Sequence, residues 1–134
     1  MVVLDTHTLI WWASDDSSLS NAAKNKIDST LNSGGEAIIS CISAWEISML
    51  IHKGRLVLSM DVEKWLDEVS QIDGIRFIPV DNEIGIKSTT LPGEFHKDPA
   101  DRIIVATARI LSIPVITADE KIIEYAHVKT ISAN

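Results

Sequence analysis

The sequence predicts an α/β domain in which a central, mostly parallel β-sheet of four to five strands lies between two layers of helices. Short apolar runs alternate with helical patterns from one end of the chain to the other, as expected for parallel strands joined by crossover helices. The chain has 134 residues, which fits one compact domain. No internal repeat or linker interrupts it, so residues 1–134 are expected to form a single domain.

The predicted strands are short runs in which β-branched residues predominate, a composition that favours extended chain. The first run ends at Asp5, and the others are bounded by glycine, proline or polar residues. Together they supply the four to five strands of the predicted sheet. They are Val2–Leu4, Ala37–Ile42, Ile75–Val80 and Pro114–Thr117, with Val128–Ile131 as an edge strand.

The predicted helices are recognised by apolar periodicity and by residues typical of helix ends. After a helix from Thr6 to Ala13, Ser20 is placed to cap a helix through about Leu31. The segment Asp61–Ile72 is amphipathic, with its apolar residues on one face. Gly54 is placed to end the helix before it. The remaining helices are expected at Ser43–Lys53, Asn82–Leu91, Ala100–Leu111 and Asp119–Ala126.

Composition excludes several classes of protein. The chain carries 12 basic and 19 acidic residues, a net charge of −7, which argues against binding nucleic acid through a broad basic surface. An enzyme that meets nucleic acid through metal ions is still compatible with this charge. The one cysteine, Cys41, excludes a disulfide framework and is expected in the core. No apolar stretch is long enough to span a bilayer and no signal peptide is evident, so a cytoplasmic location is expected.

Four acidic residues are expected to meet at one edge of the sheet. Asp5 ends the first strand, and Glu46 lies in the helix that follows the second. Asp101 lies in the first turn of the helix before the fourth strand, and Asp119 lies two residues beyond that strand. Ligands of open parallel sheets bind at the carboxyl ends of the strands. These acids are therefore candidates for a shared site.

Each acid also has a purely structural interpretation. Asp5, Asp98 and Asp119 are all placed to cap helices, and Ser43-Ala44-Trp45-Glu46 fits a capping box. Against this, Glu46 interrupts a nearly apolar stretch, and Asp101 shares a helix face with apolar residues. A buried carboxylate is costly without a compensating cation. Oxygen ligands suit Mg²⁺ or Mn²⁺, so a metal site is the competing interpretation.

Four segments, taken in series, make the chain similar to a known family. Together they resemble the PIN-domain ribonucleases and, within that superfamily, the VapC toxins of bacterial and archaeal toxin–antitoxin pairs. The resemblance spans nearly the whole chain and implies a PIN-like three-layer α/β/α fold. The segments are Leu4–Trp12, Ile42–Ile47, His96–Ala108 and Ile116–Asp119.

The resemblance implies a metal-dependent endoribonuclease that hydrolyses RNA phosphodiesters with Mg²⁺ or Mn²⁺. The family's catalytic and metal-binding acids match Asp5, Glu46, Asp101 and Asp119. It also implies an RNA substrate, a cognate antitoxin and a homodimer. Whether one or two ions bind, and which carboxylate acts as base, stays open. Candidate accessory residues, chosen because they lie near these acids in the sequence, are Thr6, Asp98, Arg102 and Thr117.

These accessory residues have structural alternatives. Asp98 is interpreted as a helix cap rather than a ligand, and the Thr6 and Thr117 hydroxyls as partners of helix N-termini. Arg102 is expected to pair with Asp101 or to contact a substrate phosphate, with a solvated ion pair as an equal alternative. Since like charges close together disfavour ionisation, at least one carboxyl of the cluster should have a raised pKa.

Two other enzyme or signalling classes also place an aspartate after the first strand. A haloacid-dehalogenase-like phosphatase needs a second acid two residues later, where this chain has His7. A receiver-like signalling domain needs a lysine after its last core strand, and Thr117-Ala118-Asp119 supplies none. Both are kept as alternatives.

Overall fold

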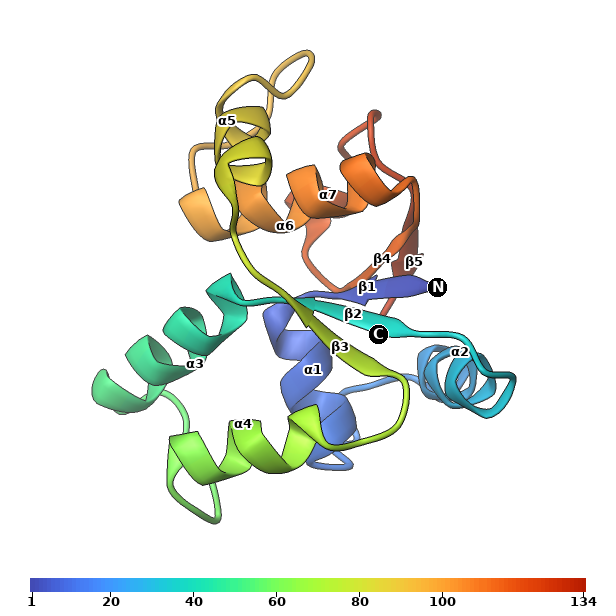
Figure 1. The fold of residues 1–134 in the computed structure, drawn as a ribbon, viewed down its shortest axis with the longest axis vertical. Helices are drawn as coiled ribbons and strands as arrows, with labels where there is room; N and C mark the ends of the chain where they lie inside the picture. The colour runs from blue at the N-terminus through green and yellow to red at the C-terminus, as the bar shows by residue number, and fades with distance from the viewer.

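The computed structural model describes residues 1–134 as three layers, with a five-stranded sheet between two groups of helices (Figure 1). One group holds α5, α6 and α7, and the other holds α1 to α4. The strands are β1 (Val2–Leu4), β2 (Ala37–Ser40), β3 (Ile75–Ile78), β4 (Val115–Thr117) and β5 (Thr130–Ser132). The helices are α1 (Thr6–Ala13), α2 (Asn21–Asn32), α3 (Ile42–His52), α4 (Val62–Ser70), α5 (Asn82–Thr89), α6 (Pro99–Leu111) and α7 (Glu120–Ile123).

The sheet is parallel throughout, in the order β3-β2-β1-β4-β5. Strand β1 is central, with Leu4 in register with Ile39 of β2 on one side and with Ile116 of β4 on the other. The connections leave β1 in opposite directions, so a crevice opens between β1 and β4 at their carboxyl ends. Asp5 and Asp119 follow these two strands directly or within two residues.

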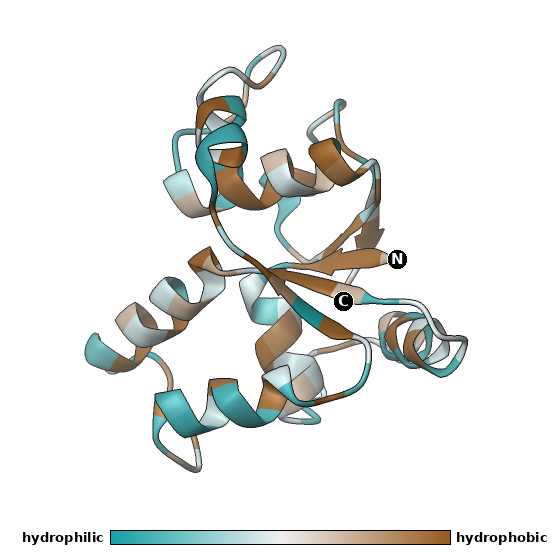
Figure 2. Ribbon diagram, in the orientation of Figure 1, coloured by the Kyte–Doolittle hydropathy of each residue, from teal (hydrophilic) through white to brown (hydrophobic).

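The core lies on both faces of the sheet because successive strand residues point to opposite sides. Val2 and Leu4 of β1 pack on the face covered by α1, α2 and α4, whereas Val3 packs on the face covered by α6. These three side chains are essentially inaccessible to solvent. Figure 2 shows strands that are apolar along most of their length between helices of mixed hydropathy, as expected for a sheet buried on both sides.

All five predicted strands and seven predicted helices are present, with shifted ends. The second strand ends at Ser40 rather than Ile42, because Cys41 already has helical dihedral angles and α3 begins at once. Cys41 is exposed in this turn, so its predicted place in the core was wrong.

The last elements also differ in extent from the sequence prediction. Helix α7 has only one turn, because the buried Tyr125 turns inward and its hydroxyl donates to the carbonyl of Pro92. The fifth strand starts at Thr130 instead of Val128, since Val128 packs into the core beside α6. No helix in the chain combines the length and apolar character needed to cross a membrane.

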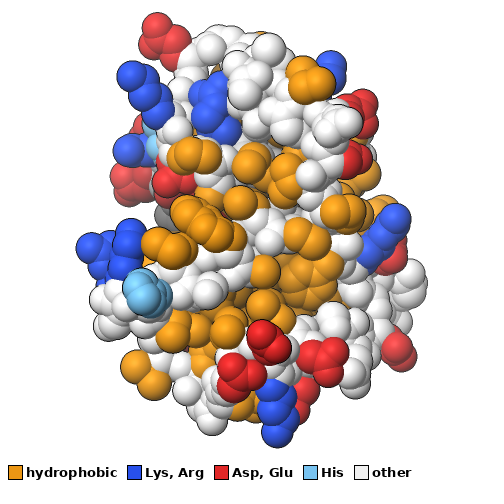
Figure 3. Space-filling view, turned by 60° about the vertical axis from the view of Figure 1, so that its left-hand side comes forward, with side chains coloured by type: hydrophobic (Ala, Val, Ile, Leu, Met, Phe, Trp, Pro, Cys, Tyr) orange, Lys and Arg blue, Asp and Glu red, His pale blue; other side chains and the backbone are white.

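Several apolar side chains remain at the surface. Trp45 on α3 is 58% exposed, Ile86 on α5 is 65% exposed and Val57, between α3 and α4, is 90% exposed. Figure 3 shows apolar side chains in a band across the face that carries α3 and α4. A groove of about 730 Å³, which Trp12 and Val57 help to line, runs between the end of α1, the segment 57–60 and α4. The groove, rather than the singly exposed side chains, is the candidate surface for contact with another protein chain.

The tight turn before β3 generates a test of the fold. Gly74 has φ +89°, and a Cβ there would lie 2.6 Å from Cδ2 of Leu31 and 3.0 Å from the carbonyl oxygen of Gly35. Gly74→Ala is therefore expected to lower the free energy of unfolding by about 2 kcal/mol. The matched variant Gly85→Ala, in α5 with no atom near the new Cβ, should raise it by about 0.5–1 kcal/mol. Urea unfolding measures both, and equal effects would contradict this packing of the turn.

Candidate functional site

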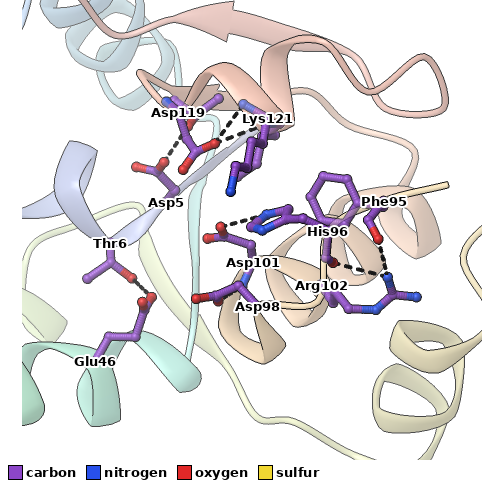
Figure 4. A network of polar contacts seen from close by, with 12 residues as sticks. Asp5, Thr6, Glu46, Phe95, His96, Asp98, Asp101, Arg102, Asp119 and Lys121 are labelled. Carbon is purple, nitrogen blue, oxygen red and sulfur yellow. Dashed lines mark hydrogen bonds and ion pairs between the residues drawn. The ribbon is translucent and has the colours of Figure 1, made fainter.

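A small cavity at the carboxyl edge of the sheet collects the acids that the sequence singled out. Its volume is about 350 Å³. Asp5 comes from the end of β1, Glu46 from α3, Asp101 from α6 and Asp119 from the start of α7, and Figure 4 shows them around one space. The predicted convergence is thus present in the structure. The lining residues are Asp5, Thr6, His7, Trp11, Glu46, Asp98, Asp101, Ala118 and Asp119.

Asp5 is buried, caps a helix and remains a candidate ligand of the site. One carboxylate oxygen accepts a hydrogen bond from the backbone N–H of Thr8 at 2.9 Å, which caps α1. The other accepts a hydrogen bond from the hydroxyl of Thr117. Burial raises the pKa of Asp5, and these two hydrogen bonds oppose the rise. Capping therefore does not exclude Asp5 from the site, since it uses one oxygen of two.

Glu46 does not take part in a capping box, so that interpretation was wrong. Helix α3 begins at Ile42, and Ser43 therefore lies inside the helix rather than at its cap. The Glu46 carboxylate instead accepts a hydrogen bond from the hydroxyl of Thr6, whose oxygen is 2.9 Å from Oγ of Ser43. Burial raises the pKa of Glu46, and the neighbouring charges of Asp98 and Asp5 add to the effect.

Asp101 is the most perturbed acid of the cavity. It lies in the first turn of α6, but Asp98 is the cap of this helix and accepts the backbone N–H of Asp101 at 3.0 Å. The Asp101 carboxylate accepts no backbone hydrogen bond, and its side chain is only 18% exposed. Burial, followed by the charges of Asp98 and Asp119, raises the pKa of Asp101 from 3.8 to about 7. The predicted raised pKa is confirmed, although burial contributes more than charge repulsion.

Asp119 and Asp98 lie toward the outer side of the cavity and cap helices. Asp119 accepts the backbone N–H groups of Lys121 at 2.8 Å and Ile122 at 3.2 Å. Its own N–H donates to the hydroxyl oxygen of Thr117 at 3.0 Å. Asp98 is exposed, and its capping bond agrees with the interpretation of this residue as a cap.

The hydroxyls of Thr6 and Thr117 each donate a hydrogen bond to a carboxylate of the cavity. Thr6 donates to Glu46 and Thr117 donates to Asp5, so the preferred interpretation as a partner of a helix N-terminus was wrong for Thr6 and incomplete for Thr117. Thr117 also accepts the backbone N–H of Asp119, the N-cap residue of α7, as that interpretation predicted. Each hydroxyl fixes the orientation of one carboxylate oxygen, which a preorganised site needs.

Arg102 points away from the acids, so neither prediction for it is supported. Its guanidinium donates to three backbone carbonyls, those of Ser88 at 2.7 Å, Phe95 at 3.0 Å and His96 at 3.2 Å. Arg102 therefore holds the connection between α5 and α6 in place.

His96, which lies near the site in the sequence but was not predicted as a site residue, lies beside Asp101. Its Nε2 atom is 3.0 Å from Oδ2 of Asp101. The sequence gave no sign of this contact, because His96 belongs to a loop and shows no recognisable ligand spacing. Tertiary structure alone brings it beside Asp101, at the outer side of the cavity.

The negative charge of the cavity has almost no counter-charge in the chain. The ion pairs with lysine or arginine are Lys24–Asp15 and Arg76–Glu36, and neither involves an acid of the cavity. Five carboxylates thus line this cavity together with His7, and His96 lies 3.0 Å from Asp101 at its outer side. An excess of oxygen donors without lysine or arginine fits a hard divalent cation.

The family of the chain follows from comparison with known proteins. The family model described as PIN domain matches residues 2–128, and the chain belongs to this family. The chain is 28% identical over 131 residues to Ribonuclease VapC22 of Mycobacterium tuberculosis, a match that covers 98% of this chain and 96% of that protein. Family and fold thereby agree with the resemblance noted in the sequence.

Solved structures of the same fold cover essentially the whole chain. VapBC2 from Rickettsia felis, bound to a DNA fragment from its promoter, matches with a TM-score of 0.74 at 14% identity and covers 100% of both chains. FitAcB from Neisseria gonorrhoeae has a TM-score of 0.69 at 19% identity, covering 99% of this chain and 98% of that chain. A toxin–antitoxin complex from Klebsiella pneumoniae has a TM-score of 0.67 at 18% identity, covering 100% of this chain and 98% of that chain.

The raised pKa of Asp101 predicts how stability depends on pH without metal. Between about pH 4 and pH 7 the folded protein holds a proton that the unfolded chain has released, so its stability falls as pH rises through this interval. Asp101→Asn removes this destabilising charge. In EDTA at pH 8 the variant should be more stable than wild type by about 1–3 kcal/mol, with little difference at pH 4. Thermal unfolding at both pH values measures this.

A helix-stabilising role for Asp101 predicts the opposite sign. Loss of an acid from the first turn of α6 would then cost a few tenths to about 1 kcal/mol. Asp73→Asn, at an exposed position outside the cavity, controls for the change in net charge. A variant at Asp101 that melts below wild type in EDTA at pH 8 would show that the residue serves the helix alone.

Proposed function

We propose that this chain is a Mg²⁺- or Mn²⁺-dependent endoribonuclease and the toxin of a toxin–antitoxin pair. The observation that carries the proposal is the cavity in which Asp5, Glu46, Asp101 and Asp119 meet without a lysine or arginine partner. Membership of the PIN domain family and similarity to a VapC ribonuclease support the same activity.

Asp5 and Asp101 are proposed as direct ligands of the ion. Both are largely buried, and their carboxylates have raised pKa values, so a divalent cation would relieve the cost of ionising them. Glu46 and Asp119 would bind through water, complete a second ion site or orient the nucleophile. When bound, the ion supplies positive charge to the scissile phosphate and lowers the pKa of a nearby water molecule.

The two threonines have positioning roles in this proposal. The Thr117 hydroxyl donates to Asp5 and the Thr6 hydroxyl donates to Glu46. Each hydrogen bond uses one lone pair and fixes the orientation of the carboxylate, so the other lone pairs remain available to an ion. Asp98 keeps α6 capped and adds negative charge at the rim, where it raises the pKa of Asp101. Neither role requires contact with the substrate.

A cognate antitoxin is the proposed protein partner. The similar structures described as toxin–antitoxin or VapBC complexes support this assignment. Trp11 lines the acidic cavity and Trp12 lines the apolar groove, so the two adjacent side chains face different parts of the surface. An antitoxin segment with apolar side chains for the groove and one cationic side chain for the cavity would block metal binding electrostatically. The exposed Trp45 and Ile86 are consistent with self-association into a homodimer.

The two alternative functions receive no support. A phosphatase of the haloacid-dehalogenase type and a receiver-like domain would each need an acid or lysine that the cavity lacks, and the family match favours neither.

Removal of either proposed ligand should nearly abolish cleavage of RNA. We expect Asp5→Asn and Asp101→Asn each to lower Mg²⁺-dependent cleavage by at least about 100-fold, since each loses a charge that holds the ion. Asp73→Asn, an exposed acid outside the cavity, should retain wild-type activity. Mapping of cleavage ends in total RNA measures the rates, and circular dichroism checks the folding of each variant. Full activity in EDTA, or in either cavity variant, would refute the metal-dependent mechanism.

The proposed partner predicts co-purification with the product of a small adjacent gene. The complex should cleave no RNA. Val57→Asp, in the groove and 90% exposed, should weaken the complex by about tenfold or more, while Ile86→Asp, exposed but outside the groove, should not. Titration calorimetry with the purified partner measures both affinities. Equal affinities of the two variants would place the partner elsewhere, and a protein harmless on expression alone would count against a toxin.

A further inference from the structure

We propose that His96 is a nitrogen ligand of a divalent ion that Asp101 and Asp119 also bind, so that Asp119 takes the second-site role among those left open for it above. This inference rests on the metal-dependent nuclease proposed above and adds a ligand to the four carboxylates. It also gives the site a preference for ions that accept nitrogen ligands, which an all-oxygen site would lack.

The distances among the donor atoms fit one ion. Nε2 of His96 lies 3.0 Å from Oδ2 of Asp101, and one donor atom each from His96, Asp101 and Asp119 all lie within 4.8 Å of one another. Two ligands bound at about 2.1 Å and at right angles are about 3 Å apart, and opposite ligands are about 4.2 Å apart. The pair of His96 and Asp101 therefore has the spacing of adjacent ligands.

The imidazole nitrogen that faces the acids lacks a satisfactory partner. Nε2 of His96 is buried and forms no hydrogen bond, and its contact with Asp101 has the distance but not the alignment of one. A buried polar atom without a hydrogen bond is costly, and native proteins seldom leave one without a reason. His96, Asp101 and Asp119 also line a shallow depression on the outer side of the cavity. Lys121 lines this depression too but forms no ion pair there. A bound cation would use the free Nε2 atom.

The His96 ring is held in position from behind. Arg102 donates to the carbonyls of Phe95 and His96, which fixes the backbone of the loop. The Phe95 ring packs edge-on against the imidazole with centroids 4.5 Å apart, and Phe95 in turn packs on Tyr125 at 4.7 Å. Figure 4 shows the imidazole directed toward Asp101 and the Arg102 guanidinium on the side away from Asp101. Metal sites need such contacts behind a ligand, because they hold its side chain in the orientation that binding requires.

A nitrogen ligand changes which ion binds best. Mg²⁺ prefers oxygen ligands, whereas Mn²⁺ and later transition metals accept imidazole readily. His96→Gln should therefore weaken binding of Mn²⁺ by about tenfold or more, with a smaller loss for Mg²⁺. Titration calorimetry with each metal alone, on full-length protein, gives both affinities.

Pulsed electron paramagnetic resonance of bound Mn²⁺ tests the ligand directly. Wild type should show coupling to a histidine nitrogen that changes on labelling with ¹⁵N-histidine, and His96→Gln should lose it. His7 is the matched control because it lines the cavity itself, whereas His96 lines the adjoining depression and His52 and His127 line neither. Coupling that persists in His7→Gln assigns the nitrogen to His96, even if His96→Gln does not fold.

The outcomes separate this inference from the proposed function. Mn²⁺ bound to wild type without nitrogen coupling, or coupling lost in His7→Gln, would overturn the role of His96 and leave the nuclease proposal intact. A wild-type protein that binds no Mn²⁺ would overturn both.

Discussion

Negative charge gathered in one small cavity, with almost no positive charge from the chain, is the constraint on which the rest of this structure depends. Asp5, Glu46 and Asp101 all have raised pKa values there, with burial as the leading cause in each case. A fold that needed only stability would replace such acids, because buried charges without partners are costly. The cost is understandable if the cavity exists to bind a cation and a phosphate.

The parallel sheet and the helix caps offset part of the cost of gathering these carboxylates in one cavity. Strand β1 ends at Asp5, beside the point where the connections diverge, and helix N-termini surround the cavity. Asp5, Asp98 and Asp119 each accept backbone N–H groups from the first turn of a helix. Capping and metal binding are therefore compatible functions of one carboxylate. The helix ends stabilise the negative charges, and further oxygen lone pairs stay available.

Much of this arrangement could be predicted from the sequence because it follows from topology. Parallel strands with acids at their carboxyl ends must bring Asp5 and Asp119 to one edge, and an acid in the first turn of α6 joins them. Contacts that depend on the exact start of a helix or the course of a loop could not be predicted. Helix α3 starts at Ile42 rather than at Ser43, which removes the apparent capping box and turns Glu46 toward Thr6.

The loop before α6 shows the same limit. Arg102 was predicted to pair with Asp101 or a phosphate, but its guanidinium donates hydrogen bonds to three backbone carbonyls instead. The direction of a long side chain depends on which backbone groups lack partners nearby, and this information is absent from local sequence. His96 reaches the cavity for the same reason, since Arg102 and Phe95 fix the loop that carries it. Cys41 was assigned to the core because it continues an apolar run, but the chain turns there.

Anomalous diffraction from crystals soaked in Mn²⁺ is the most direct test of the central claim that this cavity holds a divalent cation. We expect a strong anomalous peak within ligand distance of Asp5 and Asp101, and its loss in crystals of Asp101→Asn soaked identically. A cavity that contains only water at saturating Mn²⁺, with the carboxylates unchanged in position, would contradict the claim.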